Sequence, residues 1–195
     1  MKQFELLEQL QQEVLNISEQ VSLHFAEESN ALLNWKEKPT SWSVLECLTH
    51  LNFYSAYYQH EIQQKLSIKS AHPETSRVYK AGLIGGYFVN MVLPSNAKKM
   101  KTLARMNPAE SQLDANQVIP KFLAYQKALI QQLEAAKALD LNKTKVPLEF
   151  FKLIYLRLGD VFRFLVAHSQ RHILQAERAL EAAKSYEHPS VKNLS

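Results

Sequence analysis

Glycine is scarce in this sequence, which has only four in 195 residues. Many short turns between strands need glycine, so a β-sandwich or β-barrel is not expected. The commonest residues are instead Leu, Ala, Glu, Gln and Lys, which all favour helix. Hydrophobic residues make up 46% of the chain and charged residues 22%, as is usual for a globular protein. The composition therefore predicts an all-α fold.

Cysteine and long apolar runs are also nearly absent. Cys47 is the one cysteine, so the chain has no partner for an intramolecular disulfide, and this usage fits a reducing compartment. The first residues include acidic and amide side chains where a signal peptide needs an apolar run. No apolar stretch approaches the roughly 18 residues that span a bilayer. We therefore expect a cytoplasmic protein with no membrane partner.

The excess of positive charge is small, at +4 with 23 basic and 19 acidic residues, and it is dispersed along the chain. Such a balance does not indicate a nucleic-acid partner, which calls for a clustered basic face. The densest positive cluster consists of Lys98, Lys99, Lys101 and Arg105. Two interpretations stay open: a solvated face, or a rim that binds an anion.

Hydrophobic spacing predicts four long helices. In residues 2–28, apolar side chains recur every three or four positions, which indicates one face of an amphipathic helix. A second helix begins with the capping box of Ser43 and Glu46 and runs to about residue 69. The last helix covers residues 158–184, and a polar tail follows from about residue 185.

The third long helix covers residues 114–139, although Pro120 in its first two turns allows a start nearer Val118. Before it lies an unusually long connection, residues 70–113, with a short helix expected at residues 87–93. What residues 80–106 do is not evident from the sequence.

Residues 141–147 form a break, and residues 148–156 are an apolar segment of undetermined type. The sequence shows no internal repeat or domain boundary. We therefore expect residues 1–195 to form a single domain, a four-helix bundle with one long crossover connection.

Two of the seven histidines, His168 and His172, are four residues apart on the last predicted helix. Residues at this spacing are neighbours on one helix face, so both imidazoles can point at a common ion. The pair lies on the apolar stripe that should face the core, where the alternative is two buried histidines satisfied by hydrogen bonds. Because Ser169 follows His168, the Glu of the zinc-protease motif is missing and peptidase chemistry is not expected.

His50 is the third candidate ligand, because it shares a face of the second predicted helix with Cys47, Tyr54, Tyr57 and Glu61. Tyr54 and Tyr57 could line a pocket there, whereas Glu61 is expected to be too distant to ligate. Cys47 could be a further ligand, although a lone helical cysteine is usually a small buried hydrophobe. The other histidines have no patterned partner and are interpreted as surface residues: His24, His60, His72 and His188.

Two segments carry a recognisable pattern: residues 38–43 followed by Glu46 and His50, and residues 164–175. They resemble the first and second signatures of the DinB-like superfamily. They are more than a hundred residues apart and stand in the family's order.

The resemblance implies a four-helix bundle with one divalent metal ion, zinc, nickel or iron, held by His50, His168 and His172. The family includes thiol-dependent S-transferases, isomerases, hydrolases and members of unknown reaction. We therefore expect a metal-dependent enzyme for a small-molecule substrate, with thiol transfer ahead of hydrolysis and a low-molecular-weight thiol as a second cofactor. The alternative is a non-catalytic metal-binding or interaction module. A homodimer is also expected from the family.

Overall fold

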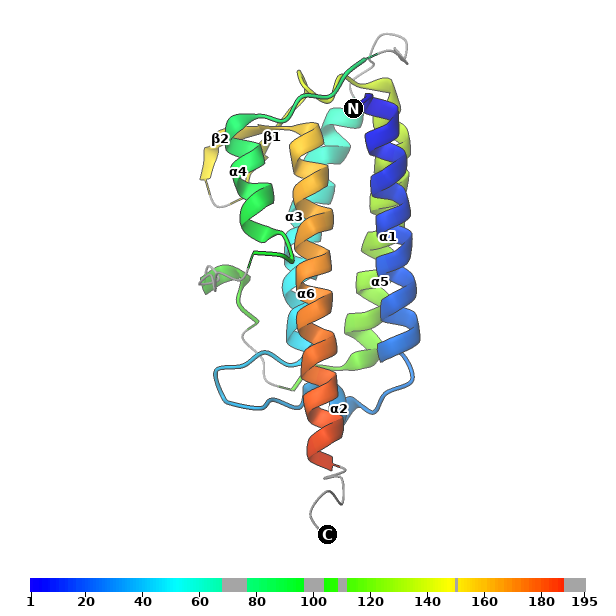
Figure 1. Cartoon of the computed structure of the whole chain (residues 1–195), viewed down its shortest axis with the longest axis vertical. Coiled ribbons are helices and arrows are strands. Elements are labelled where there is room, and N and C mark those ends of the chain that lie inside the picture. The colour runs from blue at the N-terminus through cyan, green and yellow to red at the C-terminus, as the bar shows by residue number, and fades with distance from the viewer. Residues whose placement is uncertain (68–76, 97–103, 109–111, 150, 188–195) are drawn as a thin grey trace.

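The computed structural model describes residues 1–67, 77–96, 104–108, 112–149 and 151–187. In this part of the chain four long helices run side by side along the longest axis (Figure 1). They are α1 (Gln3–Phe25), α3 (Val44–Leu66), α5 (Ala115–Ala135) and α6 (Leu158–Glu187). The predicted all-α, four-helix architecture is confirmed.

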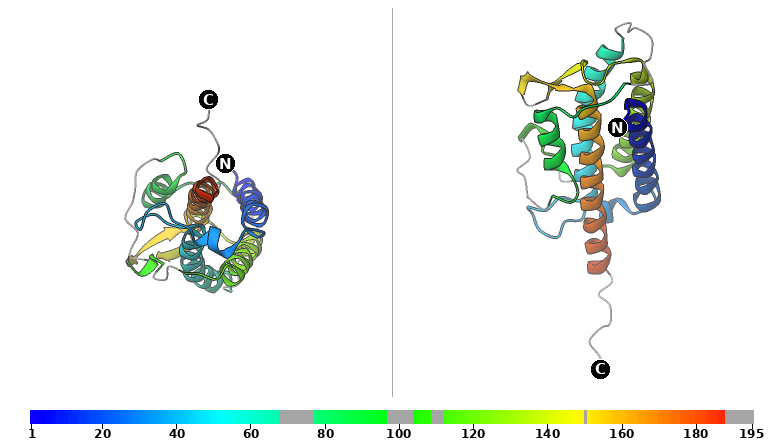
Figure 2. Two further views of the ribbon diagram at one scale, coloured as in Figure 1. Left: turned by 90° about the horizontal axis from the view of Figure 1, so that it is seen from below. Right: turned by 45° about the horizontal axis from the view of Figure 1, so that its top comes forward.

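The four long helices enclose one hydrophobic core. Helix α3 packs against both α5 and α6, and α1 packs against the same two helices from the other side (Figure 2). The largest fully buried side chains come from all four helices and include Phe25, Tyr58, Phe122 and Phe162. Burial of these apolar faces is what stabilises a bundle of this kind.

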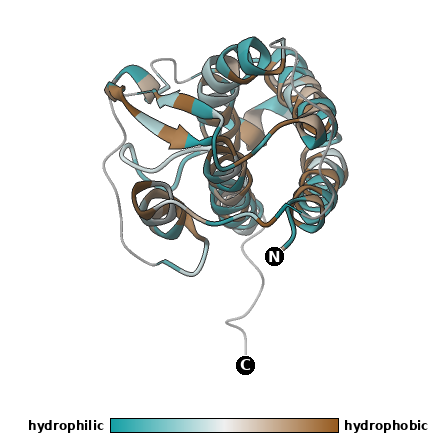
Figure 3. Ribbon diagram, turned by 90° about the horizontal axis from the view of Figure 1, so that it is seen from above, coloured by the Kyte–Doolittle hydropathy of each residue, from teal (hydrophilic) through white to brown (hydrophobic). Residues whose placement is uncertain are grey.

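The shorter elements are α2 (Asn30–Asn34), α4 (Leu83–Val92), the 3-10 turns η1 (Ala104–Met106) and η2 (Ala136–Ala138), and the strands β1 (Lys145–Leu148) and β2 (Phe151–Arg157). Helix α4 and the two strands lie on one side of the bundle, next to α3 and α6 (Figure 3), whereas η2 contacts α1 and α5. In the segment of undetermined type, residues 148–156, the described residues thus belong to an antiparallel hairpin, in which Lys145 pairs with Arg157.

The helix starts follow the capping signals in the sequence. Ser43 Oγ accepts from the Glu46 amide at 3.2 Å, and Glu46 Oε2 accepts from the Ser43 amide at 2.8 Å, so the predicted capping box is confirmed. Asp114 caps α5 by accepting from the Asn116 amide, and the alternative start near Val118 is wrong. Pro120 is accommodated inside the helix, although it cannot supply the backbone donor of an ordinary residue.

The predicted helix ends differ from the structure by a few residues. Helix α1 ends at Phe25 rather than near residue 28, and α6 continues to Glu187, beyond the residue 185 at which a tail was expected. Helix α3 is described to Leu66, and its predicted end at residue 69 lies outside the described residues. Among the described helices, none is both long enough and apolar enough to cross a membrane.

Helix α4, predicted at residues 87–93, begins earlier because its first turn is anchored on α6. Asp160, which is 1% exposed, accepts hydrogen bonds from the Tyr79 hydroxyl and, at 3.0 Å, from the Gly82 amide. A Cβ atom on Gly85 would lie only 2.4 Å from Asp160 Cγ, whereas one on Gly86 would meet nothing within 4 Å. Glycine at position 85 therefore allows α4 to approach α6 closely.

These two glycines give a matched pair for stability measurements. We predict that Gly85→Ala lowers the free energy of unfolding by about 1–3 kcal/mol, because the new methyl group overpacks against a buried carboxylate. Gly86→Ala should instead leave stability unchanged or raise it by up to about 1 kcal/mol through better helix propensity. Urea denaturation of the metal-free proteins measures both, and equal stability of the two variants would contradict the assigned role of Gly85.

Candidate metal centre

Three histidines from two neighbouring helices meet inside the bundle. His50 comes from α3, and His168 and His172 come from successive turns of α6. Their candidate ligand atoms all lie within 4.8 Å of one another, and the Nε2 atoms of His50 and His168 are 3.2 Å apart. The structure therefore brings together the three histidines that the sequence singled out.

Hydrogen bonds behind two of the rings direct their free nitrogens toward the cluster. His50 Nδ1 lies 2.7 Å from the carbonyl oxygen of Met106, and because that oxygen can only accept, Nδ1 carries the proton. His172 Nδ1 lies 3.1 Å from Gln175 Oε1 and is the donor there on the same grounds. Nε2 of both rings then keeps its lone pair, which is the arrangement that outer partners of metal-bound histidines enforce.

Burial keeps all three imidazoles neutral. Loss of hydration lowers the pKa of His50 to about 4, against a smaller opposing effect of the Met106 hydrogen bond. Burial, together with the nearby His50, lowers the pKa of His172 to about 3. The pKa of His168 falls well below its usual value, first through burial and then through the adjacent His172 and His50. Neutral imidazole is the form that binds metal ions.

The donor set and its spacing fit a divalent ion. Imidazole nitrogen suits zinc, nickel and iron. Tetrahedral zinc with bonds of about 2.0–2.1 Å places neighbouring nitrogens roughly 3.3 Å apart, close to the 3.2 Å between His50 and His168. Two nitrogens this close need a proton or a cation between them, because facing lone pairs repel. His168 Nδ1 is buried and has no hydrogen-bond partner among the described residues. No hydrogen bond at Nδ1 therefore determines which of the two nitrogens of this ring carries the proton.

Aromatic rings surround the cluster. Trp42 stacks on His172 with ring centroids 5.5 Å apart, and its ring lies 4.8 Å from that of His50. Phe164 stacks on His168 at 5.3 Å, and Tyr54 lies 4.7 Å from the His168 ring. These contacts restrain rotation of the imidazoles.

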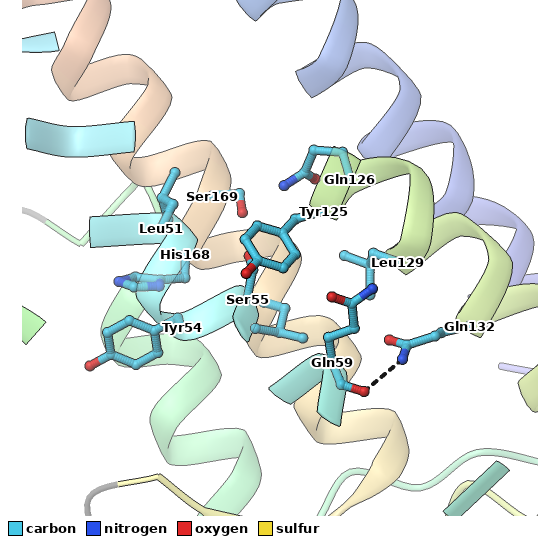
Figure 4. A pocket seen from close by; sticks show the side chains of 11 residues that line it. Leu51, Tyr54, Ser55, Gln59, Tyr125, Gln126, Leu129, Gln132, His168 and Ser169 are labelled. Atoms are coloured by element: carbon cyan, nitrogen blue, oxygen red, sulfur yellow. Dashed lines mark hydrogen bonds between the residues drawn. The ribbon is translucent and has the colours of Figure 1, made fainter. Parts of the chain in front are cut away.

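Polar side chains stand among apolar ones in the bundle interior beside His168. A small cavity of about 20 Å³, room for about one water molecule, is bordered by α3, α5 and α6 (Figure 4). Gln132 lines it and donates to the Gln59 carbonyl at 2.8 Å, and the buried Gln126 projects from α5 into the same region. Tyr54 is at the cavity edge, and burial raises the pKa of its hydroxyl to about 12.

Other candidates from the sequence lie outside the histidine cluster. Cys47 is fully buried, burial raises the pKa of its thiol, and neither it nor Glu61 belongs to the group that could hold a metal. His24 and His60 are exposed and contact Glu177 and Gln64, respectively, which confirms the surface interpretation for both. His72 and His188 lie outside the described residues.

The basic cluster is only partly described. Lys98, Lys99 and Lys101 lie outside the described residues. Arg105 is paired: its Nε is 2.9 Å from Glu149 Oε1, and its Nη2 is 3.0 Å from both Glu149 Oε2 and the Glu149 carbonyl oxygen. Sequence reasoning missed Glu149 as well as the carbonyl of Met106, and no motif or spacing marks either residue.

Comparison with known families adds to this geometry. A family model of the DinB superfamily matches residues 5–176, which is most of the chain and includes all three clustered histidines. The chain belongs to the DinB superfamily. No curated protein and no solved structure matches the sequence. For this DinB protein, therefore, the choice of substrate has to be argued from its own residues.

Proposed function

We propose that this DinB-superfamily chain binds one divalent metal ion, zinc, nickel or iron, through His50, His168 and His172. We propose further that it acts as a metal-dependent enzyme on a small molecule. The observation that supports this best is the convergence of three neutral imidazoles, two buried and one half-buried, two of which are held by hydrogen bonds at Nδ1. Three protein ligands leave a position open, as in catalytic rather than structural sites.

A divalent ion in this site would supply a Lewis acid that makes a bound water or thiol easier to ionise. The residues of the chain hold and enclose the reacting molecules. Trp42 is half-buried, so its ring borders both the histidine cluster and solvent. Tyr54 stays protonated near neutral pH and can donate a hydrogen bond to a substrate from the other side of the cluster.

Thiol transfer is the reaction that this set of side chains favours over hydrolysis. The negative charge of Glu149 raises the pKa of the nearby Tyr54 hydroxyl, but this carboxylate is already paired with Arg105. A free general base is therefore not evident among the described residues of the site. A thiol ionises near pH 8.5, far more readily than water, so it needs less help from a base. In the proposed reaction its proton leaves to solvent, sulfur bonds to an electrophilic carbon, and the leaving group departs.

Other expectations from the sequence stay predictions. The low-molecular-weight thiol, the homodimer and the cytoplasmic location each need a direct test. Metal-dependent hydrolysis and a non-catalytic metal-binding or interaction role are the alternatives that the experiments below separate from thiol transfer.

The metal site is tested by elemental analysis of protein purified without a histidine tag. We predict close to one equivalent of divalent metal in the wild type and loss of most of it in His50→Ala and His168→Ala. His24→Ala is the matched control, since His24 is exposed and paired with Glu177, and it should keep the wild-type metal content. Helical circular dichroism should persist after chelation, because apolar burial between the helices stabilises the fold. Unchanged metal content in both site variants would contradict the proposal.

The reaction is tested with a chromogenic aryl halide and bacillithiol, glutathione or coenzyme A. We predict conjugation by metal-loaded protein with at least one thiol, and none above background by metal-stripped protein or by His168→Ala. His24→Ala should react like the wild type. Turnover that persists in His168→Ala, or no conjugation with any thiol, would exclude thiol transfer. Metal-dependent cleavage of nitrophenyl esters would then point to hydrolysis.

A further inference from the structure

The orientation of His50 depends on a residue far from it in the sequence. Its Nδ1 donates to the carbonyl oxygen of Met106 at 2.7 Å, across 56 positions of the chain. Met106 ends η1, a three-residue 3-10 turn, and so short a turn has little hydrogen bonding of its own to fix its position. The Met106 side chain is buried in the core, which fixes where the residue lies. The direction of its backbone carbonyl depends on the contacts of neighbouring residues.

Arg105, the neighbour of Met106 in η1, forms a bidentate ion pair with Glu149 of the hairpin. Its guanidinium meets the Glu149 carboxylate through Nε to Oε1 at 2.9 Å and Nη2 to Oε2 at 3.0 Å. Nη2 also donates to the Glu149 carbonyl oxygen at 3.0 Å. Two parallel hydrogen bonds between charged groups fix orientation as well as distance. The pair therefore holds the backbone of η1 in one orientation.

The acidic partner is itself tied to the helix that carries His50. The Glu149 side chain is only 8% exposed, whereas that of Arg105 is 56% exposed. The backbone amide of Glu149 donates to the hydroxyl of Tyr58, a buried residue two turns after His50 on α3, at 3.4 Å. These contacts connect α3 to the hairpin, the hairpin to η1, and η1 back to His50 on α3.

We infer that Arg105 and Glu149 are a positioning pair for the metal ligand His50, acting through the carbonyl of Met106. This rests on the proposed metal site. The ion pair keeps the Met106 carbonyl in line with His50 Nδ1, so that the His50 proton stays on Nδ1 and Nε2 faces His168 and His172. Without the pair, η1 shifts, the hydrogen bond weakens, and His50 samples the other tautomer.

The test compares Glu149→Gln with Glu134→Gln. The control removes the same charge from a partly exposed ion pair with Lys137, at 2.7 Å, and Glu134 is not one of the clustered histidines' partners. Zinc affinity is measured by competition with a chromophoric chelator. We expect Glu149→Gln to bind zinc more weakly, by up to the roughly 10–100-fold that follows loss of the direct hydrogen-bond partner of a metal-bound histidine. Glu134→Gln should bind like the wild type. Arg105→Lys, which keeps the charge but not the two-pronged geometry, should fall between them.

A second measurement uses the metal-free protein and so does not depend on metal binding. Nitrogen-15 spectra of the histidine rings should show His50 as the Nδ1–H tautomer in the wild type and in Glu134→Gln. In Glu149→Gln and Arg105→Lys they should show a mixture of tautomers. Wild-type protein that binds no zinc would overturn the proposed function, while the tautomer comparison would still decide this inference. A lowered melting temperature in Glu149→Gln with unchanged zinc affinity and an unchanged His50 tautomer would overturn the positioning role.

Discussion

The meeting of three imidazoles between α3 and α6, two of them buried and one half-buried, is the constraint on which the rest of the structure depends. Buried polar groups destabilise a core unless their hydrogen-bonding atoms find partners. Here Met106 and Gln175 accept from two of the rings, and the inward-facing nitrogens lie close together. A cation that accepts the remaining lone pairs would complete the arrangement. The hydrogen-bonding needs of the histidines thus explain why Met106 and Gln175 lie next to them.

The bundle and the irregular segments have separate roles. The apolar faces of α1, α3, α5 and α6 form the core that holds the helices together. The hairpin, η1 and α4 lie on the side of α3 and α6, where the histidines are. From this side η1 delivers the carbonyl that orients His50, and Asp160 anchors the start of α4 on α6. The long crossover between α3 and α5 therefore supplies contacts to the site as well as a connection.

Much of this architecture is predictable from the sequence, because helix periodicity and capping are local. Ser43 with Glu46 marks the start of α3, and the spacing of His168 and His172 places both on one face. The hairpin is not predictable in this way, because a short apolar segment has no distinctive period. The Met106 carbonyl is also invisible to such reasoning, since every residue has a backbone oxygen. Glu149 is brought to Arg105 only by the tertiary fold.

The central claim is that three neutral imidazoles, with no sulfur ligand, hold a metal ion in this chain. X-ray absorption spectroscopy of the zinc-loaded protein tests it most directly, because it identifies the ligand atoms around the metal. We predict three imidazole nitrogens at about 2.0–2.1 Å, completed by a light atom from solvent. Scattering from sulfur at about 2.3 Å, or a shell with fewer than three imidazoles, would contradict it.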